Sequence, residues 1–331
     1  MINNSQRIGF LRIASLTCCL AAALNAAEAV GAGTAGANNS KYLVVNLENG
    51  TKRYTNQAPD LSKDDCRTTE LWLRRIPAGS FTMGSPDSES GRDTDENQHQ
   101  VTLTKAFFIG VFECTQRQWE LVMGSKPSHF NNAAYYMTRP VERVSYNDIR
   151  GVSSNGGAGW PEFGHSVDSD SFLGNLRAKT GLEFDLPTEA EWEYACRAGT
   201  TTPLNSGNGL TAPEECPNMA KVGRYLFNGG SESGKTAAGA TAKVGSYQPN
   251  AWGLYDMHGN VWEWCLDWYE EYPTASVKDP KGASSGQFRL LRGGSWNNEA
   301  QYCRSAIRIC DRQSTRGDGS GFRVALSASI Q

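Results

Sequence analysis

Histidine, unbalanced charge and long hydrophobic runs are what this sequence has least of. Its four histidines are scattered, which disfavours zinc or iron catalysis because such sites need several close ligands. No C-x-x-C pair occurs, which disfavours a zinc ribbon or a thioredoxin site. The 32 Lys and Arg residues nearly cancel the 35 Asp and Glu residues, and a net charge of −3 lacks the basic footprint of a nucleic-acid binder. After the N-terminal region, no segment approaches the roughly 18 apolar residues of a membrane span.

Glycine and aromatic residues are abundant instead. The 331 residues include 35 Gly, 9 Trp and 12 Tyr. Glycine permits tight turns and the aromatic rings supply large surfaces for burial, so this composition predicts a loop-rich fold. It disfavours a helical bundle or a disordered chain. The length allows about two domains, or one large irregular domain.

The N-terminus predicts export. Residues 1–29 contain a positively charged start with Arg7 and Arg12, an apolar run over 13–24 and the cleavage pattern Ala27-Glu28-Ala29. This is the order of a secretory signal peptide, and the apolar run is too short for an ordinary transmembrane helix. We therefore expect a periplasmic, secreted or cell-surface protein.

Export changes how the nine cysteines are interpreted. Cys18 and Cys19 leave with the signal peptide, with lipidation of either as the alternative. Seven cysteines remain, and this odd number leaves at least one unpaired or intermolecular in an oxidising compartment. Each is expected to be a buried thiol or part of a structural disulfide. The seven are Cys66, Cys114, Cys196, Cys216, Cys265, Cys303 and Cys310.

Short strands and a few helices are expected after a small, polar linker over 30–40. The clearest helix covers 188–199, where Thr188 and Glu191 form a capping box and Gly199 ends the helix. A second helix covers 115–123, with Thr115 as its N-cap. After Gly199 we expect loops and brief strands. The other predicted elements are strands over 41–46, 71–76 and 79–83, a strand pair within 101–111, and a short helix starting at Asn147.

Several long motifs occur in a fixed order along the chain. They are FTMGS at 81–85, RPVERVSYND at 139–148, LPTEAEWEYACRAG at 186–199, PNAWGLYDMHGNVWEW at 249–264, RGGSW at 292–296 and GFRV at 321–324. With these motifs the chain resembles the formylglycine-generating enzyme family, also called the sulfatase-modifying factor domain, over residues 69–327. The resemblance implies an α+β, C-type-lectin-like fold with little regular secondary structure. Residues 30–68 are then a linker and N-terminal strand segment.

The enzyme of this family oxidises a substrate cysteine to formylglycine with copper and oxygen, using two cysteines that follow a Gly-Gly-Ser-aromatic motif. Here the second cysteine matches Cys303, but the first position is Asn298. Copper(I) is soft and a linear site needs two thiolates, so the amide of Asn298 is not a substitute. The resemblance therefore predicts loss of the oxidase chemistry. If that chemistry persists, Cys303 and Ser295 are its candidate catalytic residues. Ser295 lacks the G-x-S-x-G context of a hydrolase nucleophile.

A calcium site is also implied by the resemblance. Asn260 and Glu263 lie in the segment that is similar to the family's calcium loop, with the carbonyl group of Val261 between them. Closely spaced oxygen ligands suit Ca²⁺. Asn218 matches a second calcium position. The alternative is an ordinary turn in which Asn260 caps nearby backbone.

The segment 296–320 suggests a binding surface. In it, a fixed frame alternates with positions that look free to vary, an arrangement similar to the variable proteins of diversity-generating retroelements. Apolar side chains on an otherwise polar segment would form a contact patch. The alternative is an ordinary surface loop. The candidate ligand-binding residues are Trp296, Asn297, Asn298, Tyr302, Ile307, Ile309 and Asp311.

The sequence thus predicts an exported scaffold that lacks the copper oxidase chemistry and presents 296–320 to a protein or glycan ligand. One alternative is a formylglycine-generating oxidase that modifies sulfatase cysteines. The other is a retroelement-diversified variable protein. No nucleic-acid partner and no membrane span are expected.

Overall fold

The computed structural model describes residues 40–152, 159–229 and 239–328. The chain divides into two units, residues 1–40 and 41–331, and the fold below is that of the second unit. The predicted signal peptide over 1–29, with Cys18 and Cys19, lies outside the described residues. Among the residues that are described, no helix is both long enough and apolar enough to cross a membrane.

A five-stranded antiparallel sheet begins the fold. Its strands lie in the order β12-β6-β3-β1-β2. Val44 on β1 lies opposite Arg53 on one neighbouring strand and opposite Trp72 on the other. Residues 41–68, which the sequence analysis separated from the domain, therefore supply an interior strand of its largest sheet. The strands are β1 (Tyr42–Asn46), β2 (Lys52–Thr55), β3 (Glu70–Ile76), β6 (Phe107–Gly110) and β12 (Ala325–Ser327).

Two smaller sheets complete the β structure. One has the order β10-β9-β7-β11, and it consists of β7 (Trp262–Trp268), β9 (Arg289–Arg292), β10 (Arg308–Asp311) and β11 (Ser320–Gly321). The other has the order β4-β5-β8, and it consists of β4 (Gly79–Met83), β5 (His99–Leu103) and β8 (Val277–Lys278). The seven residues of β7 are more than the brief strands that the sequence predicted after Gly199.

The helices are short and begin at side-chain caps. The capping box predicted at Thr188 and the N-cap predicted at Thr115 both form, because each hydroxyl accepts from the third helical N–H. At Thr115 the side chain of Gln118 completes a capping box that was not predicted. The helix that starts at Thr188 ends at Ala198, in a left-handed conformation with φ of 45°, one residue before Gly199. The helices are α2 (Asp65–Thr68), α3 (Gln116–Met123), α4 (Tyr146–Arg150), α5 (Phe172–Thr180), α6 (Glu189–Arg197), α7 (Met219–Val222) and α8 (Leu226–Gly229), with 3-10 turns η1 (Tyr136–Thr138) and η2 (Ala300–Cys303).

Helix α5 was not predicted from the sequence. Ser171 caps its first turn by accepting from the N–H of Gly174, and Gly181 ends it with φ of 66°. Its buried Phe172 stacks on Trp119 of α3, with ring centroids 5.0 Å apart. The helix is therefore fixed by packing that joins distant parts of the chain, which no local pattern reveals.

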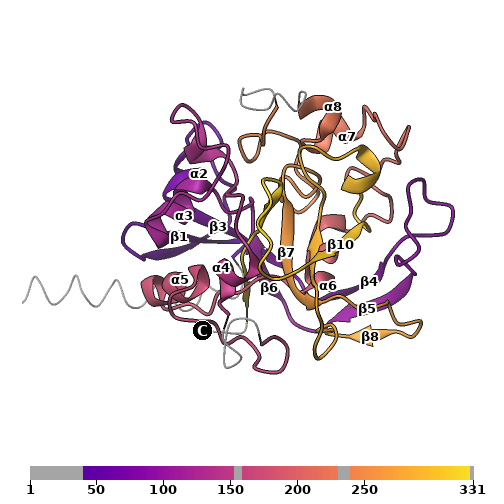
Figure 1. Cartoon of the computed structure of the whole chain (residues 1–331), viewed down its shortest axis with the longest axis horizontal. Coiled ribbons are helices and arrows are strands. Elements are labelled where there is room, and N and C mark those ends of the chain that lie inside the picture. Colours follow the sequence, from indigo (N-terminus) through magenta and orange to yellow (C-terminus); the bar gives the residue numbers. More distant parts are fainter. Residues whose placement is uncertain (1–39, 153–158, 230–238, 329–331) are drawn as a thin grey trace, which may run out of the picture. The chain divides into compact units, whose positions relative to one another are not determined.

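The core follows the alternation of the strands. On β1, Leu43 and Val45 face one hydrophobic cluster with α3 and α5, whereas Tyr42 and Val44 face another with α2. A third cluster joins α6 to strands β7 and β9. Figure 1 shows α2, α3 and α5 on the side of β1 and β3, and α6 beside β7. Few regular elements around these clusters confirm the predicted α+β class with little regular secondary structure.

Candidate functional site

The Gly-Gly-Ser-Trp turn approaches Cys303 very closely. Gly294 has φ of 80°, and a Cβ atom there would lie 2.5 Å from the Cys303 Sγ. Such a contact is possible only for glycine, which has no Cβ and tolerates positive φ. The motif therefore fixes the position of the thiol that the family resemblance singled out.

Cys303 is fully buried in an apolar environment. It lies in a cluster with Leu204, Met219 and Tyr225, and burial raises the pKa of its thiol far above the usual range. Its carbonyl oxygen accepts from Nδ1 of His258 over 2.6 Å, while Nε2 of His258 accepts from the backbone N–H of Asn205 over 3.0 Å. Burial lowers the pKa of His258 to about 4, so its imidazole is neutral near pH 7. Its two ring nitrogens link the backbone at Cys303 to the backbone at Asn205.

Asn298 does not supply a second copper ligand. Its side-chain oxygen accepts from the N–H of Ser295 over 3.0 Å and from the Ser295 hydroxyl over 2.5 Å. These bonds make a local turn. Because copper(I) prefers two thiolates and only Cys303 carries sulfur at the two matched positions, these residues do not fit a linear copper site. In the described residues the seven predicted cysteines are free thiols, six of them buried.

The expected calcium ligands are occupied by protein groups. Both carboxylate oxygens of Glu263 accept from Arg323 over 2.6 Å. The side-chain oxygen of Asn260 accepts from the N–H of Ala242 over 2.8 Å, and its amide group donates to Glu113. The Val261 N–H also donates to Glu113, over 3.1 Å. In this arrangement the side-chain oxygens of Asn260 and Glu263 accept from protein donors, which a Ca²⁺ ion would have to displace.

A surplus of buried carboxyls nonetheless surrounds Arg323. Burial, together with the nearby charges of Asp256 and Glu263, raises the pKa of Glu113 well above its usual range. Burial raises the pKa of Asp256 to about 6. Asn218 lies apart from this network, at the start of α7, where it donates to the carbonyl oxygen of Gly209 over 3.1 Å. Within the described ranges, no group of three His, Cys, Asp or Glu side chains is placed to hold a metal ion, and calcium stays a prediction.

The structure divides the predicted ligand-binding residues into buried and exposed ones. Trp296 is 5% exposed and packs edge-on against Phe130, and Ile307 is 2% exposed in the main core. This burial corrects the expectation that both contribute to a contact patch. Tyr302 is 43% exposed, Asn297 is exposed, and Ile309 is half-buried. Only part of the predicted patch therefore faces solvent.

The exposed part leads into a turn over residues 311–317, called here the C-terminal turn. The carboxylate of Asp311 accepts from the N–H of Arg312 over 2.6 Å and from the hydroxyl of Thr315 over 2.8 Å. Two backbone bonds hold the turn on the loop before α4: Arg143 donates to the carbonyl oxygen of Gly317 over 2.9 Å, and Asn147 donates to that of Gln313 over 3.0 Å. Backbone contacts thus fix the turn, while Arg312, Ser314 and Arg316 are exposed.

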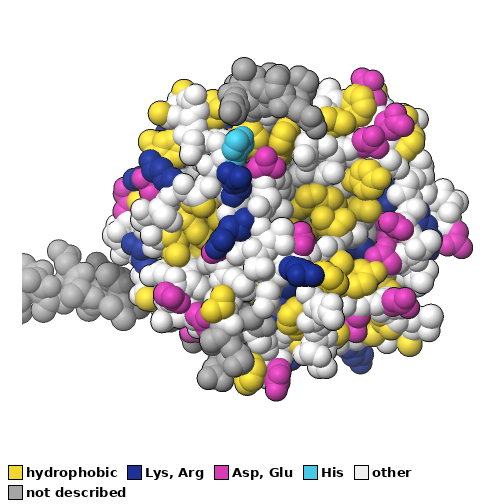
Figure 2. All heavy atoms as spheres, in the orientation of Figure 1, with side chains coloured by type: hydrophobic (Ala, Val, Ile, Leu, Met, Phe, Trp, Pro, Cys, Tyr) yellow, Lys and Arg dark blue, Asp and Glu magenta, His cyan; other side chains and the backbone are white. Residues whose placement is uncertain are grey.

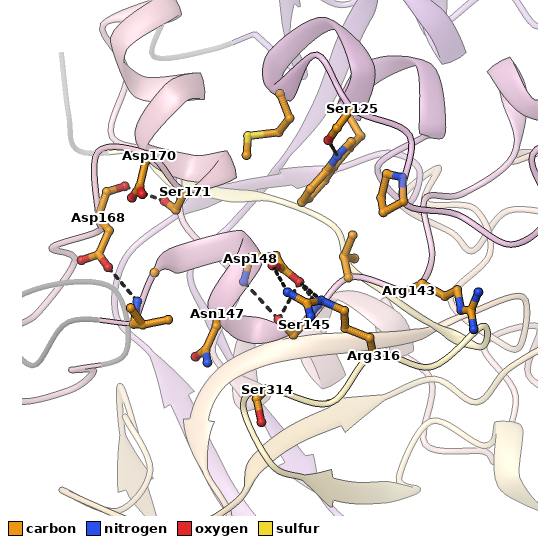
Figure 3. Close-up of a pocket in the computed structure, with 16 residues that line it drawn as sticks. Ser125, Arg143, Ser145, Asn147, Asp148, Asp168, Asp170, Ser171, Ser314 and Arg316 are labelled. Carbon is orange, nitrogen blue, oxygen red and sulfur yellow. Dashed lines mark hydrogen bonds and ion pairs between the residues drawn. The ribbon is translucent and has the colours of Figure 1, made fainter.

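This turn forms one wall of an open, polar pocket of about 780 Å³. Figure 3 shows Arg316 beside Asp148, with Asp168 and Asp170 across the pocket and Arg143 on the opposite side of the view. The pocket lies where α3, α4 and the start of α5 meet the C-terminal turn. Its labelled lining residues are Ser125, Arg143, Ser145, Asn147, Asp148, Asp168, Asp170, Ser171, Ser314 and Arg316.

An ion pair closes one side of the pocket. Arg316 donates from Nε and Nη2 to the two carboxylate oxygens of Asp148, each over 2.6 Å. Asp148 also caps α4 by accepting from the N–H and hydroxyl of Ser145. Burial alone would raise the pKa of Asp148, but the hydrogen bonds from Arg316 and Ser145 lower it. The carboxylate therefore stays ionised and holds Arg316 in place.

Two buried side-chain oxygens have no partner among the described residues: Asn147 lines the pocket, and Gln313 lies on the C-terminal turn outside the lining. Asn147 Oδ1 and Gln313 Oε1 are buried without a hydrogen bond in the part of the chain that the structure describes. Buried polar atoms nearly always bind a donor, so such a pair marks a place where water or a ligand would bind. The pocket was not predicted from the sequence, because Arg316 and Asp148 are 168 positions apart. The only local pattern that pointed to it was the cap that Ser145 and Asp148 form at the start of α4.

The described fold and its motifs define an α+β domain built around a buried Gly-Gly-Ser turn. A model of the sulfatase-modifying factor enzyme 1-like domain matches residues 58–328, and the chain belongs to this family. The formylglycine-generating enzyme of Streptomyces coelicolor is 40% identical over 285 residues, which cover 77% of this chain and 89% of that protein. The family resemblance drawn from the motifs is thereby confirmed.

Two solved structures are similar to the fold. Treponema denticola variable protein 1 has a TM-score of 0.61 and 29% identity, covering 78% of this chain and 96% of that one. PvdO from Pseudomonas aeruginosa has a TM-score of 0.60 and 30% identity, covering 80% of this chain and 96% of that one. The predicted formylglycine-generating-enzyme, C-type-lectin-like fold is confirmed by these neighbours. One of them is a variable protein and not a formylglycine-generating enzyme by name.

Proposed function

We propose that this chain is an exported member of the family that lacks the copper oxidase chemistry and binds a polar ligand, a protein segment or a glycan, at the C-terminal turn. The observation that carries the proposal is that this turn, part of the segment 296–320, forms a wall of the pocket of about 780 Å³. Asn298 in place of a thiol, and the buried thiol of Cys303, support the loss of oxidase chemistry.

The chemistry of the pocket suits a hydrogen-bonding ligand. Its lining includes carboxylates, which accept hydrogen bonds, guanidinium groups, which donate them, and hydroxyls, which do both. The buried side-chain oxygen of Asn147, a lining residue, has no donor among the described residues. Acidic and basic side chains are interspersed on the face shown in Figure 2, so the surface does not favour one sign of charge. Recognition would therefore come from matched hydrogen bonds.

Binding is tested by blocking the pocket. A Ser314→Arg variant places a bulky side chain on its exposed wall, and a Ser88→Arg variant makes the same change at an exposed turn elsewhere. The purified protein is screened against a glycan panel and a peptide panel, and the affinity of each binder is measured. We expect at least one polar binder whose affinity falls about tenfold or more in the Ser314 variant and is unchanged in the Ser88 variant. Equal affinities in both variants, or no binder in either panel, would overturn the proposal.

The oxidase alternative is tested with copper. A sulfatase-type cysteine peptide is incubated with the copper-loaded protein, with the Streptomyces coelicolor enzyme as positive control, and conversion is followed by mass spectrometry. We expect no formylglycine from this chain. Titration with Cu(I) should show weak binding by the wild type and stronger, thiol-dependent binding by Asn298→Cys, which supplies the second sulfur. Conversion of the peptide by the wild type would contradict the proposal.

A second candidate function is that of a retroelement-diversified receptor. It is favoured by the similarity to Treponema denticola variable protein 1 and by the exposed positions Asn297, Tyr302 and Ser314 on a framework of buried residues. The test is to sequence the DNA beside the gene. A reverse transcriptase gene and a near-copy of the last codons support this function, and their absence ends it.

Export rests on residues 1–29. Cell fractions are separated and the N-terminal sequence of the protein in each is determined. We expect a periplasmic, secreted or cell-surface form that starts at residue 30 or later. A full-length chain confined to the cytoplasm would contradict export without affecting the pocket.

A further inference from the structure

We propose that a second pocket, at the β12 edge of the five-stranded sheet, binds a small carboxylate with an apolar body. The cavity has a volume of about 460 Å³, which is within the range of small-molecule sites. It is separate from the pocket at the C-terminal turn. The residues that carry the argument are Lys105, Phe107, His165, Glu191, Lys281 and Leu326.

The floor of this pocket is apolar and rigid. Strand β12 pairs with β6, so that Leu326 lies opposite Phe108 and Ser327 opposite Phe107. Asp185 is joined to Ala325 by two backbone bonds of 2.9 and 2.6 Å. Phe107 and Leu326 lie on opposite faces of the sheet and both contribute to the lining, to which Leu103, Trp160 and Leu186 add apolar surface. A preformed apolar floor favours a ligand with a hydrocarbon body, because binding removes apolar surface from water.

The acidic side chains around the pocket already have partners. Asp185 accepts from Nε and Nη2 of Arg150 over 2.7 and 3.0 Å. Glu183 pairs with Arg177 over 2.7 Å.

The remaining two acids are also accounted for. Asp279 accepts from the N–H and hydroxyl of Thr104 over 2.7 and 2.5 Å. Glu191 accepts from the N–H of Thr188 over 2.9 Å, and burial raises its pKa. Asp185 and Glu183 therefore have cationic partners, whereas Asp279 and Glu191 accept only from neutral groups of the described residues.

The two lysines differ in this respect. Lys105 and Lys281 are exposed at the rim and make no ion pair with any residue that the structure describes. The Lys281 ammonium lies 5.8 Å from the ring centroid of Trp160. Two exposed ammonium groups at the rim thus stand against one exposed carboxylate without a cationic partner among the described residues, that of Asp279. This net positive balance attracts an anion and disfavours a cation. A lysine ammonium binds a carboxylate through charge-assisted hydrogen bonds, and an apolar body attached to that carboxylate would fill the floor.

His165 is held at the same rim. Its Nδ1 lies 2.7 Å from Asp185 Oδ2, and its ring packs on Trp160 with centroids 4.8 Å apart. With Nδ1 bound to the carboxylate, Nε2 is the nitrogen available to a ligand. His165 therefore lines the pocket with a fixed ring orientation. The two lysines supply the positive charge that selects an anionic ligand.

The test uses three probes of the same shape and different charge: phenylacetate, phenylacetamide and phenethylamine. Their affinities for the full protein are measured by titration calorimetry. We expect phenylacetate to bind in the millimolar range or tighter, phenylacetamide more weakly, and phenethylamine not to bind. Equal binding of the amine, or no binding of phenylacetate, would overturn the proposal.

Variants locate the site. Lys105→Gln and Lys281→Gln should each weaken phenylacetate binding about threefold, and the double variant about tenfold, as expected for partly exposed charge pairs. Lys52→Gln removes an exposed lysine of β2 and is the matched control, with no expected change. All three sites are exposed, so the variants should fold like the wild type. Unchanged affinity in the double variant would overturn the assignment and would leave the proposal for the C-terminal turn intact.

Discussion

Five arginines follow one another in the C-terminal segment, and they divide into two kinds. Arg304, Arg308 and Arg323 are buried, and we call them the arginine frame; Arg312 and Arg316, on the C-terminal turn, are exposed. Each member of the frame binds a buried carboxylate, whereas Arg316 binds the half-buried Asp148 at the rim of a pocket. Arginine therefore stabilises the fold where it is buried and shapes a solvent-facing surface where it is exposed.

The frame explains how a loop-rich chain keeps one structure. Arg304 binds Glu96 through two nitrogens over 2.6 and 2.8 Å, and Arg308 binds Glu189 over 2.8 and 2.9 Å. The first pair ties the residue after η2 to the loop before β5, and the second joins strand β10 to helix α6. Removing one partner of a buried pair leaves an uncompensated charge, so the frame tolerates little change. The C-terminal turn is less constrained, because backbone bonds hold it and Arg312, Ser314 and Arg316 are exposed.

The largest effect should come from breaking the frame. Arg323→Met leaves the Glu263 carboxylate buried without its two hydrogen bonds. We expect the free energy of unfolding, measured by chemical denaturation, to fall by about 3–5 kcal/mol. Arg316→Met, whose side chain is 58% exposed in the native protein, is the matched control and should lose less than about 1 kcal/mol. Equal losses of unfolding free energy in the two variants would contradict the proposed difference between the arginine frame and the C-terminal turn.

The second effect concerns Glu142, which lies under the C-terminal turn. Burial raises its pKa to about 7, although its carboxylate accepts from the N–H groups of His129 and Phe130. A raised pKa means that the folded state holds the proton, so this stability is present below about pH 4.5 and is lost as the pH rises through about 7. We expect on the order of 2 kcal/mol less stability at pH 8 than at pH 5 from this group.

Glu142→Gln removes that titration. The variant should show a flatter dependence of the unfolding free energy on pH between about 5 and 8, while Glu48→Gln, at an exposed turn, should keep the wild-type slope. An unchanged slope in Glu142→Gln would mean that other buried carboxyls, such as Asp256, account for the whole effect.

The third effect isolates the turn that positions Cys303. Gly294→Ala introduces both an unfavourable φ of 80° and a Cβ atom 2.5 Å from the Cys303 Sγ. Gly124→Ala, with φ of 69° and nothing within 4 Å of the new Cβ, has only the backbone cost. We expect the Gly294 variant to lose about 1–3 kcal/mol, clearly more than the Gly124 variant, in thermal or chemical unfolding. If Gly294→Ala loses no more unfolding free energy than Gly124→Ala, the structure around Cys303 can move to accommodate the added Cβ atom.

Local features of the fold could be predicted from the sequence, whereas the pocket could not. The Thr188–Glu191 capping box, the strand at 79–83 and the Gly-Gly-Ser turn all lie where the sequence placed them. The pocket does not carry such a signal, because Arg316 and Asp148 meet only after the chain has folded. Ile307 shows the converse error: its place between polar residues suggested exposure, yet it alternates into the core beside β10. Long-range packing, which one sequence does not display, made that difference.

The smallest effect is the one that tests the C-terminal turn itself. A double-mutant cycle on Arg316→Ala and Asp148→Ala should give a coupling energy of about 0.5 kcal/mol that decreases with added salt, because the guanidinium group is exposed and screened. Asp148 also caps α4, so its single variant should lose about 1 kcal/mol more than Arg316→Ala. A coupling of several kcal/mol, insensitive to salt, would place Arg316 in the arginine frame, and the C-terminal turn would then not be free to vary around a ligand.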